Sequence, residues 1–442
     1  MLRPTQENES SSNFGNRLEM RELIIPLSAP EATDANRFGP KAANLAALGQ
    51  AGLPVPGGYC LDAEAYRLQL KSLGLEDSAR AVFSAEDFEA RRHALDVRLG
   101  LFDEPIDESL RAPLLAAWRE LMAAPDTLGV VRSSALVEDR FGSSFAGQFE
   151  SFLGLENETE FLTAVRSCWC ALWSTRALRY MATHDADPAD TAMALIVQPL
   201  VHAQASGGGL SQTAEGEMLL SATWGLGSAI AQGEVVPDRY VLSRDGEVLD
   251  MTTGRKTHSV SCVHGTQSVD RELAEEPCLN HAQLSELGTL LRKTEDVIGG
   301  PTEIEWTLDS DGIKLVQARP LHVEKPHVPD EIWDQRPLLR GHPAGIGWGT
   351  GRARVVNCEC ELSTVGPGDV LITKVAGPAL SQILPHVSAV VAELGGSTSH
   401  LASLARERGI PMVLGVLDAT RAIPDGSTVA VDGVAGIVRW IA

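Results

Sequence analysis

The sequence has 442 residues, of which 44% are hydrophobic and 22% are charged, and its formal net charge is −22. This length predicts two or three domains with buried cores, and the acidic balance argues against a nucleic-acid partner, because phosphate backbones require basic surfaces. No run of about 18 uncharged apolar residues occurs, so we expect neither a transmembrane helix nor a membrane partner.

The first twenty residues are polar and contain no apolar core, so they predict a disordered tail rather than a secretory signal. The seven cysteines include two close pairs, Cys168/Cys170 and Cys358/Cys360, but no C-x-x-C motif. We therefore expect reduced thiols in a cytoplasmic protein.

Residues 21–320 mix helical and strand patterns, which predicts an α+β or α/β domain with subdomains. Apolar residues at helical spacing predict helices over 45–53, 64–74 and 106–124. Short apolar runs bounded by turn residues predict buried strands at Leu128–Val131, Ala194–Val197 and Met218–Ala222.

Residues 321–345 contain four prolines among charged side chains, which predicts a semi-stiff linker that avoids helix and sheet. Residues 346–442 predict a compact, β-rich domain with one clear helix over 399–408. Its predicted strands are Gly351–Val356, Asp369–Thr373, Ala389–Ala392, Pro411–Gly415 and Thr428–Val431.

The strongest chemical motif surrounds His400. An apolar strand passes through Gly395-Gly396 and Thr398-Ser399 into a helix that begins near the histidine. The glycines permit a tight turn, and Thr398 or Ser399 can cap the helix, whose free N–H groups favour an anion. A neutral imidazole in that position can attack phosphorus. The alternative is a capped helix with a histidine that faces solvent.

A phosphohistidine needs a phosphoryl donor, and no G-x-x-x-x-G-K-[ST] loop occurs in the chain to bind one. Lys41 is a point charge suited to a phosphate oxygen, or else a solvated lysine. Arg132 leaves an apolar strand and can bind two phosphate oxygens. Its alternative is a salt bridge with Glu138 or Asp139.

Two other regions carry polar side chains on predicted strands. Gln198 ends an apolar strand and suits the edge of a nucleotide base, although a structural glutamine fits equally well. On an extended strand Glu303 and Glu305 point to the same face, and a second strand presents Gln317 and Arg319 together. Two carboxylates on one face favour Mg²⁺ or an arginine partner over a bare surface pair, and Arg319 can neutralise phosphate.

Taken together, these segments resemble the phosphoenolpyruvate synthase and pyruvate, phosphate dikinase family, and also the rifampin phosphotransferases. The Gly-Gly-x-Thr-Ser-His core, the Ala-Arg pair after it and the Gly-Ile-Pro end all match. The resemblance covers about residues 37–320 and 345–440. It implies an α+β and α/β multidomain fold, in which an ATP-grasp nucleotide-binding domain precedes a small β-rich phosphohistidine swivelling domain. The expected divisions are a tail (1–20), the ATP-grasp domain (21–320), the linker (321–345) and the swivelling domain (346–442).

By this resemblance the cofactors are ATP and Mg²⁺. Lys41 and Arg132 contact phosphates, and Gln198 lies at the adenine. The implied catalytic residues are His400, Arg132 and Arg319. The implied cofactor-binding residues are Lys41, Arg132, Ser151, Gln198, Glu305, Gln317 and Arg319, and the implied metal ligands are Glu303, Glu305 and Gln317.

Two features depart from the family pattern. Glu303 stands where the family often has aspartate, and 206–211 replaces a Ser-Gly-Val/Ile-x-Phe-Thr sequence with Ser-Gly-Gly-Gly-Leu-Ser. We expect an altered loop there, and with it an altered approach of the histidine domain. The chain leaves no room for a pyruvate-binding barrel or a rifamycin-binding domain, so we expect the acceptor site elsewhere.

The predicted function is an ATP-dependent phosphotransferase of dikinase type. It transfers the β-phosphoryl group of ATP to His400, releases AMP and passes the group to an acceptor. That acceptor is an unknown small molecule or a separate acceptor-domain subunit. The alternatives are an ATP-dependent ligase, in which the phosphohistidine activates a carboxylate or hydroxyl for condensation, and a non-catalytic regulatory or scaffold protein.

Overall fold

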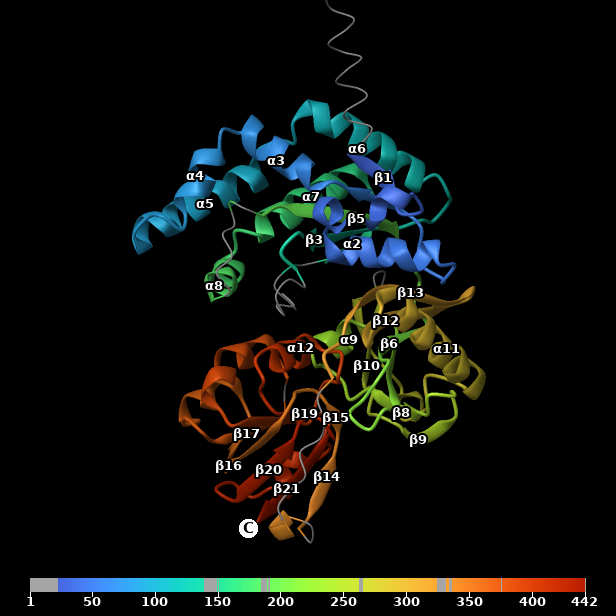
Figure 1. The fold of residues 1–442 in the computed structure, drawn as a ribbon, viewed down its shortest axis with the longest axis vertical. Coiled ribbons are helices and arrows are strands. Elements are labelled where there is room, and N and C mark those ends of the chain that lie inside the picture. Colours follow the sequence, from blue (N-terminus) through green and yellow to red (C-terminus); the bar gives the residue numbers. More distant parts are fainter. Residues whose placement is uncertain are drawn as a thin grey trace, which may run out of the picture. The chain divides into compact units, whose positions relative to one another are not determined.

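The computed structural model describes residues 23–138, 149, 151–183, 189, 191–261, 265–323, 331–333, 336–374 and 376–441 (Figure 1). The predicted tail lies outside the described residues. Within those ranges, no helix is long and apolar enough to cross a membrane. The chain divides into two compact units: the first consists of residues 1–50, 56–138 and 148–200, and the second of 51–55, 139–147 and 201–442.

The first unit contains a five-stranded antiparallel sheet in the order β1-β2-β5-β3-β4. Its strands are β1 (Ile24–Pro26), β2 (Tyr59–Leu61), β3 (Gly129–Ala135), β4 (Ser151–Leu155) and β5 (Met193–Pro199). Helices α2 and α7 pack against β3. The first unit's helices are η1 (Pro30–Thr33), α2 (Ala35–Gln50), α3 (Ala63–Ser72), α4 (Glu76–Ala81), α5 (Asp87–Asp103), α6 (Glu108–Leu121), α7 (Glu158–Ala171) and α8 (Thr175–Thr183).

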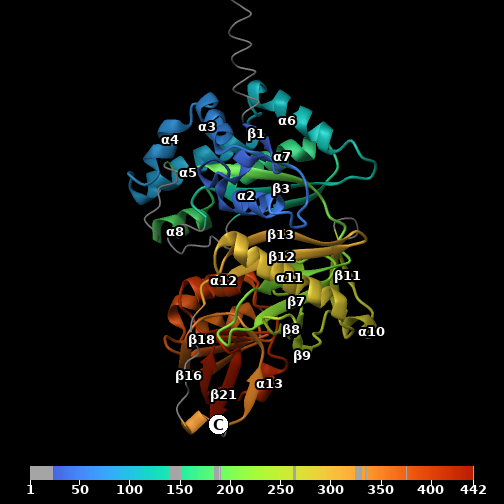
Figure 2. The same cartoon turned by 45° about the vertical axis from the view of Figure 1, so that its right-hand side comes forward.

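The second unit begins with a six-stranded antiparallel sheet in the order β13-β12-β6-β7-β8-β9, called the six-stranded sheet below. Its strands are β6 (Ala205–Leu210), β7 (Met218–Trp224), β8 (Asp238–Leu242), β9 (Val248–Thr252), β12 (Thr302–Asp309) and β13 (Gly312–Pro320). Helix α11 (His281–Ile298) packs on β12 and β13, as Figure 2 shows. Smaller elements are α9 (Ser228–Ala231), the hairpin β10 (His258–Ser261) and β11 (Gly265–Ser268), and α10 (Arg271–Ala274).

The rest of the second unit is built on an eight-stranded sheet, in which β16 to β19 are parallel neighbours. Its strands are β14 (Leu338–Arg340), β15 (His342–Pro343), β16 (Trp348–Val356), β17 (Val370–Thr373), β18 (Ala389–Ala392), β19 (Met412–Leu414), β20 (Thr428–Asp432) and β21 (Ile437–Ile441). Its helices are η2 (Glu331–Trp333), η3 (Glu359–Thr364), η4 (Pro378–Gln382), η5 (Leu384–His386), α12 (His400–Glu407) and α13 (Ala419–Ala422).

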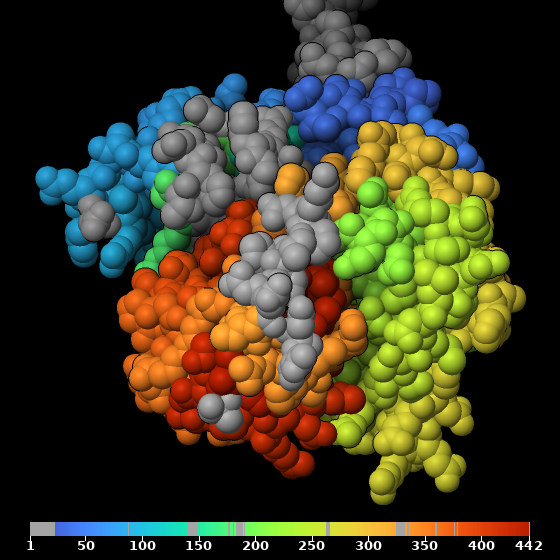
Figure 3. Space-filling model, turned by 60° about the horizontal axis from the view of Figure 1, so that its bottom comes forward, coloured from blue at the N-terminus to red at the C-terminus, as the bar shows by residue number. Residues whose placement is uncertain are grey.

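The eight-stranded sheet holds a dense apolar core, because β17 and β18 are buried throughout and, apart from Thr373, consist of valine, isoleucine, leucine and alanine. Its surface adjoins that of the six-stranded sheet's segment, as the orange-red and yellow-green atoms in Figure 3 show. A backbone hydrogen bond of 2.9 Å from Gly395 N to Val235 O joins the two segments.

Most predicted elements are confirmed. The strand predicted at Ala389–Ala392 is β18 with the same bounds, and the helix predicted over 399–408 is α12. The linker expectation is wrong in part: β14 and β15 lie inside 321–345, because they pair with β21 and β19 at the sheet's two edges. Residues 324–330 and 334–335 lie outside the described residues, and the domain boundaries stay predictions.

Two other expectations need correction. The glycine run at 206–211 is not a loop, because residues 205–210 form β6, paired to β12 and β7 in the middle of its sheet. The cysteines are not all reduced thiols, because Cys358 and Cys360 form a disulfide. Among the described residues the free cysteines, all buried, are Cys60, Cys168, Cys170 and Cys278.

Candidate functional site

The segment around His400 folds as a strand, a glycine turn and a capped helix. Gly395 has φ +93°, a left-handed conformation that favours glycine after β18. The Ser399 side chain accepts a hydrogen bond of 3.2 Å from Ala402 N, so Ser399 is the helix cap. His400 is the exposed first residue of α12. The imidazole is therefore presented at the end of the helix that favours anions.

Strands β12 and β13 bring the four polar residues predicted on them into one group. Their antiparallel register places Glu303 opposite Arg319 and Glu305 opposite Gln317. Because side chains two apart on a strand share a face, all four project to one side of the sheet edge. The sequence predicted that the two residues on each strand share a face, and the strand register shows that the two pairs are neighbours.

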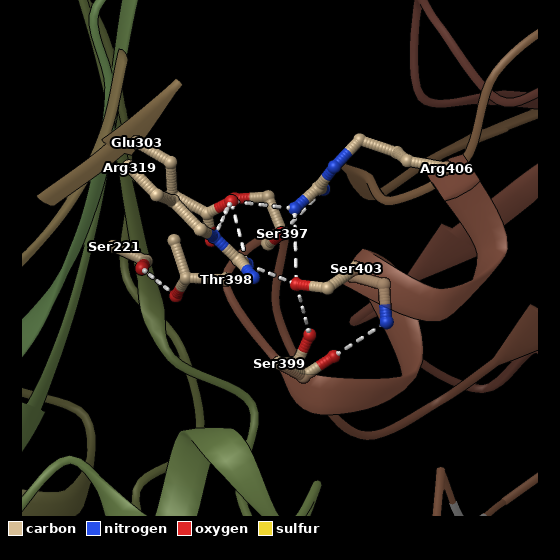
Figure 4. A network of polar contacts seen from close by, with 9 residues as sticks. Ser221, Glu303, Arg319, Ser397, Thr398, Ser399, Ser403 and Arg406 are labelled. Atoms are coloured by element: carbon tan, nitrogen blue, oxygen red, sulfur yellow. Dashed lines mark hydrogen bonds and ion pairs between the residues drawn. The ribbon is translucent and has the colours of Figure 1, made fainter. Parts of the chain in front are cut away.

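The Glu303 carboxylate lies between two guanidinium groups (Figure 4). Its Oε2 is 2.8 Å from Arg319 Nη2 and 2.8 Å from Arg406 Nη2 on α12. Arg319 also donates to the hydroxyl of Ser403 on α12. Burial lowers the pKa of the Arg406 guanidinium from its ordinary value, while the charge of Glu303 opposes that shift. The helix that begins at His400 therefore contacts β12 and β13 directly, and the metal role of Glu303 stays a prediction.

The expectation that Thr398 caps the helix is wrong, because Ser399 is the cap. The Thr398 hydroxyl oxygen lies 3.4 Å from the hydroxyl oxygen of Ser221 on β7. The Thr398 side chain also fills the space in front of Gly208 on β6, where a Cβ atom would lie 2.1 Å from the threonine methyl group. The predicted link between the glycine run and the approach of the histidine segment is a direct contact.

The first unit holds the other predicted ligands. Lys41 follows Gly39, which interrupts α2 with φ +74°, and Lys41 Nζ lies 2.9 Å from Glu138 Oε1. The Ser134 hydroxyl on β3 accepts from Ala42 N at 3.2 Å, so the chain after Gly39 packs against the strand that carries Arg132. Lys41 is therefore held by a buried carboxylate rather than freely solvated.

Arg132, Ser151 and Gln198 lie on three neighbouring strands of the first unit's sheet. Arg132 pairs in register with Ser151, an adjacency that the sequence did not predict. Gln198 is buried, and its amide donates to the carbonyls of Pro56 at 3.0 Å and Gly57 at 3.2 Å. These contacts fix the glutamine at the strand end, and its predicted adenine contact stays a prediction.

Several residues at the site were not singled out from the sequence. Arg406 belongs to the family motif, but no sequence pattern predicts that it donates to Ser397 O at 2.7 Å and so fixes the turn before His400. Gly208 lies in the middle of β6, and the sequence predicts no neighbour for it. Only the fold shows that Gly208 packs against Thr398 and that Arg406 binds the carbonyl of Ser397, so that both contact the turn before His400.

His342 on β15 is a buried histidine that the sequence reading missed. Burial, and then the charge of Arg239, lower its pKa to about 3. It contacts the backbone of Pro237, and its Nδ1 lacks a hydrogen-bond partner among the described residues. The ring is therefore neutral in the folded chain at neutral pH.

We expect this histidine to destabilise the fold in acid. Since its pKa is lower in the folded chain than its ordinary 6.5, protons bind preferentially to the unfolded chain, and stability present above pH 6.5 is lost as the pH falls toward 3. Between pH 6.5 and pH 5 the loss is about 2 kcal/mol, measured by urea unfolding. His342→Gln will remove this part of the pH dependence, whereas His386→Gln, at an exposed histidine, will keep it. Equal slopes for the unchanged chain and His342→Gln would contradict the prediction.

Comparison with known proteins finds two family matches along the chain. Residues 35–337 match the family model described as pyruvate phosphate dikinase, AMP/ATP-binding domain, and residues 365–436 match the PEP-utilising enzyme, mobile domain. The phosphoenolpyruvate synthase of Aeropyrum pernix is 31% identical over 95% of the chain. The probable phosphoenolpyruvate synthase of Archaeoglobus fulgidus is 31% identical over 94%, and the Pseudomonas aeruginosa phosphoenolpyruvate synthase is 29% identical over 96%.

The chain spans 58% of the length of each of these three relatives. The two family matches follow each other in the order that the sequence predicted, and they confirm the fold class: an ATP-grasp nucleotide-binding domain followed by a small β-rich mobile domain. Because the first match covers well over half of the sequence, the chain belongs to the pyruvate phosphate dikinase AMP/ATP-binding domain family.

Proposed function

We propose that this chain is an ATP-dependent phosphotransferase of dikinase type that carries the phosphoryl group on His400. The observation that carries the proposal is the contact of α12, which begins at His400, with Glu303 and Arg319 on β12 and β13. A nucleophile on this helix meets the strand pair to which we assign the phosphate end of ATP. The names of the relatives support the same chemistry.

The proposal gives each predicted ligand a role. Lys41 and Arg132 neutralise phosphate oxygens, and Gln198 lies at the adenine. Ser151, opposite Arg132 in the sheet, adds a hydroxyl beside the phosphates. Arg319 stabilises the charge that develops on the transferring group, because a fixed guanidinium in a partly buried site needs little reorganisation.

The metal assignment rests on oxygen donors. Glu305 and Gln317 are cross-strand neighbours and together offer carboxylate and amide oxygens, which Mg²⁺ accepts. In the described residues no group of three or more histidine, cysteine or acidic side chains is arranged to hold a metal ion, and phosphate oxygens and water would complete the ligand set. When bound, Mg²⁺ would neutralise phosphate charge. Glu303 stays a predicted ligand whose carboxylate already pairs with two arginines.

In the charging step, a neutral imidazole nitrogen of His400 forms a bond to the β-phosphorus of ATP while the bond from that phosphorus to the AMP oxygen breaks. AMP leaves, and the γ-phosphoryl group is then lost to water or phosphate. The phosphohistidine next passes its group to an acceptor. We place this acceptor on a small molecule or a separate subunit, and the reaction in the cytoplasm, where ATP is supplied.

The test is incubation of the protein with Mg²⁺ and ATP labelled in turn at the β and γ positions. We expect acid-labile, base-stable label from the β position to remain on the chain with one AMP released per label. Retained γ label with ADP release would overturn the dikinase assignment, and the absence of label from either position would overturn self-charging. Formation of a joined organic product from a carboxylate and ATP would instead favour the ligase alternative.

A further inference from the structure

We propose that a docking seat on the six-stranded sheet positions His400 for charging by contacting its segment both before and after the histidine. The docking seat consists of Gly208, Ser221, Glu303 and Arg319, and it receives Thr398, Ser403 and Arg406. Figure 4 shows all of these residues except Gly208. This inference rests on the proposed function, because it assigns positioning residues to that reaction.

The first contact is the steric fit of Thr398 against Gly208. A Cβ atom at Gly208 would lie 2.1 Å from Cγ2 and 2.5 Å from Cβ of Thr398, closer than atoms can approach. Gly208 has no left-handed backbone angle, so the requirement for glycine comes from the neighbour and not from strain. Ser221 and Thr398 are 1% and 9% exposed, and their hydroxyl oxygens lie 3.4 Å apart. Thr398, two residues before the histidine, therefore occupies a space that exists because residue 208 has no side chain.

The second contact is the ion pair between Glu303 and Arg406. Glu303 reaches from β12 to Arg406, which also donates to Ser397 O at 2.7 Å. Arg406 thus connects the seat to the turn before His400 as well as to the helix after it. Arg319 adds a hydrogen bond to Ser403, one turn into the helix. His400 lies in the sequence between Thr398 and Ser403, which both contact the docking seat, so its position relative to β12 and β13 is restricted.

The charges suit a contact that must form and break. Two guanidinium groups share one carboxylate oxygen, so the cluster keeps one positive charge in excess, and its side chains are only 5% exposed for Glu303, 14% for Arg319 and 12% for Arg406. A buried ion pair gains little net free energy because each charge is desolvated, yet it enforces one geometry. The seat therefore aligns the segment without holding it permanently.

Two substitutions test the steric contact and the ion pair separately. Gly208→Ala obstructs Thr398, and Glu303→Asp keeps a carboxylate opposite Arg319 but shortens its reach toward Arg406. We expect single-turnover transfer of β label to fall by about a hundredfold in Gly208→Ala and about tenfold in Glu303→Asp, since small misplacements of reacting groups cost that much. The ATP affinity of Gly208→Ala, measured by equilibrium dialysis, will stay within about twofold. The matched control is Gly300→Ala, where a Cβ atom meets nothing within 4 Å, and it will charge normally.

Docking itself is measured with Arg255→Cys/Asp418→Cys, which places thiols at a half-exposed ion pair of 3.9 Å outside the seat. A short bis-maleimide joins them, and peptide mass identifies the 255–418 product among the other cysteines. We expect its yield to fall several-fold when Gly208→Ala or Glu303→Asp is added, and to hold with Gly300→Ala.

Cross-linking that is unchanged by Gly208→Ala and Glu303→Asp would overturn the docking seat, and so would normal charging in both. If the unchanged chain takes no label, the proposed function fails. The cross-link yields then decide the docking seat alone: a loss with either substitution supports it, and no loss overturns it.

Discussion

A chain with asparagine at His400 will bind ATP as tightly as the unchanged chain and will retain no phosphoryl label. Asparagine is close to histidine in size and hydrogen-bonding capacity, but its amide nitrogen is not a nucleophile at neutral pH. Because His400 is an exposed residue at the first position of α12, its replacement leaves the buried residues of the helix unchanged. The measurement is label per chain after a base quench, together with ATP affinity by equilibrium dialysis.

The matched control is His386→Asn, since His386 is also an exposed histidine in a short helix of the same domain. It will charge at the rate of the unchanged chain. Label that persists in His400→Asn and maps to another residue would refute the role of His400 as the phosphoryl carrier. Loss of label in both variants would indicate that the exposed histidines of this domain affect its folding and not its chemistry.

Lys256→Met will destabilise the second unit by about 3–5 kcal/mol, because it leaves a buried carboxylate without its cation. Lys256 and Asp238 are both fully buried and form an ion pair. The Asp238 carboxylate also accepts hydrogen bonds of 2.8 Å from Gly254 N and 2.8 Å from Cys278 N, and one of 3.0 Å from the Tyr240 hydroxyl. The carboxylate joins three separate stretches of chain, which are β8, residues 254–256 and residue 278, so leaving its charge unpaired weakens the contacts among them.

Urea unfolding followed by tryptophan fluorescence measures this effect. The same substitution at Lys314, whose pair with Asp309 is 27% exposed on the lysine side, will cost only about 0–1 kcal/mol. Asp238→Asn/Lys256→Met will recover part of the loss, since it removes both charges together. Equal costs for Lys256→Met and Lys314→Met would contradict the prediction that burial sets the penalty.

The sequence predicted the core of the eight-stranded sheet well because its strands are short runs of buried apolar residues, a pattern that needs no knowledge of neighbours. It failed at β14 and β15, where prolines and charges surround strands of only three and two residues. These strands are formed by pairing with β21 and β19, which are distant in the sequence. Local propensity is a weak guide for such edge strands.

The sequence by itself determined which residues are candidates for the chemistry: His400 after a glycine turn and a capping serine, and the polar pairs Glu303/Glu305 and Gln317/Arg319 on predicted strands. These follow from backbone periodicity and from the reactivity of side chains, both of which are local. Only the tertiary structure decided that Glu303 shares its carboxylate between Arg319 and Arg406, and that Gly208 makes room for Thr398. The physical reason is that strand register and the packing of one domain on another depend on residues up to about 190 positions apart, such as 208 and 398, whose approach no local pattern encodes.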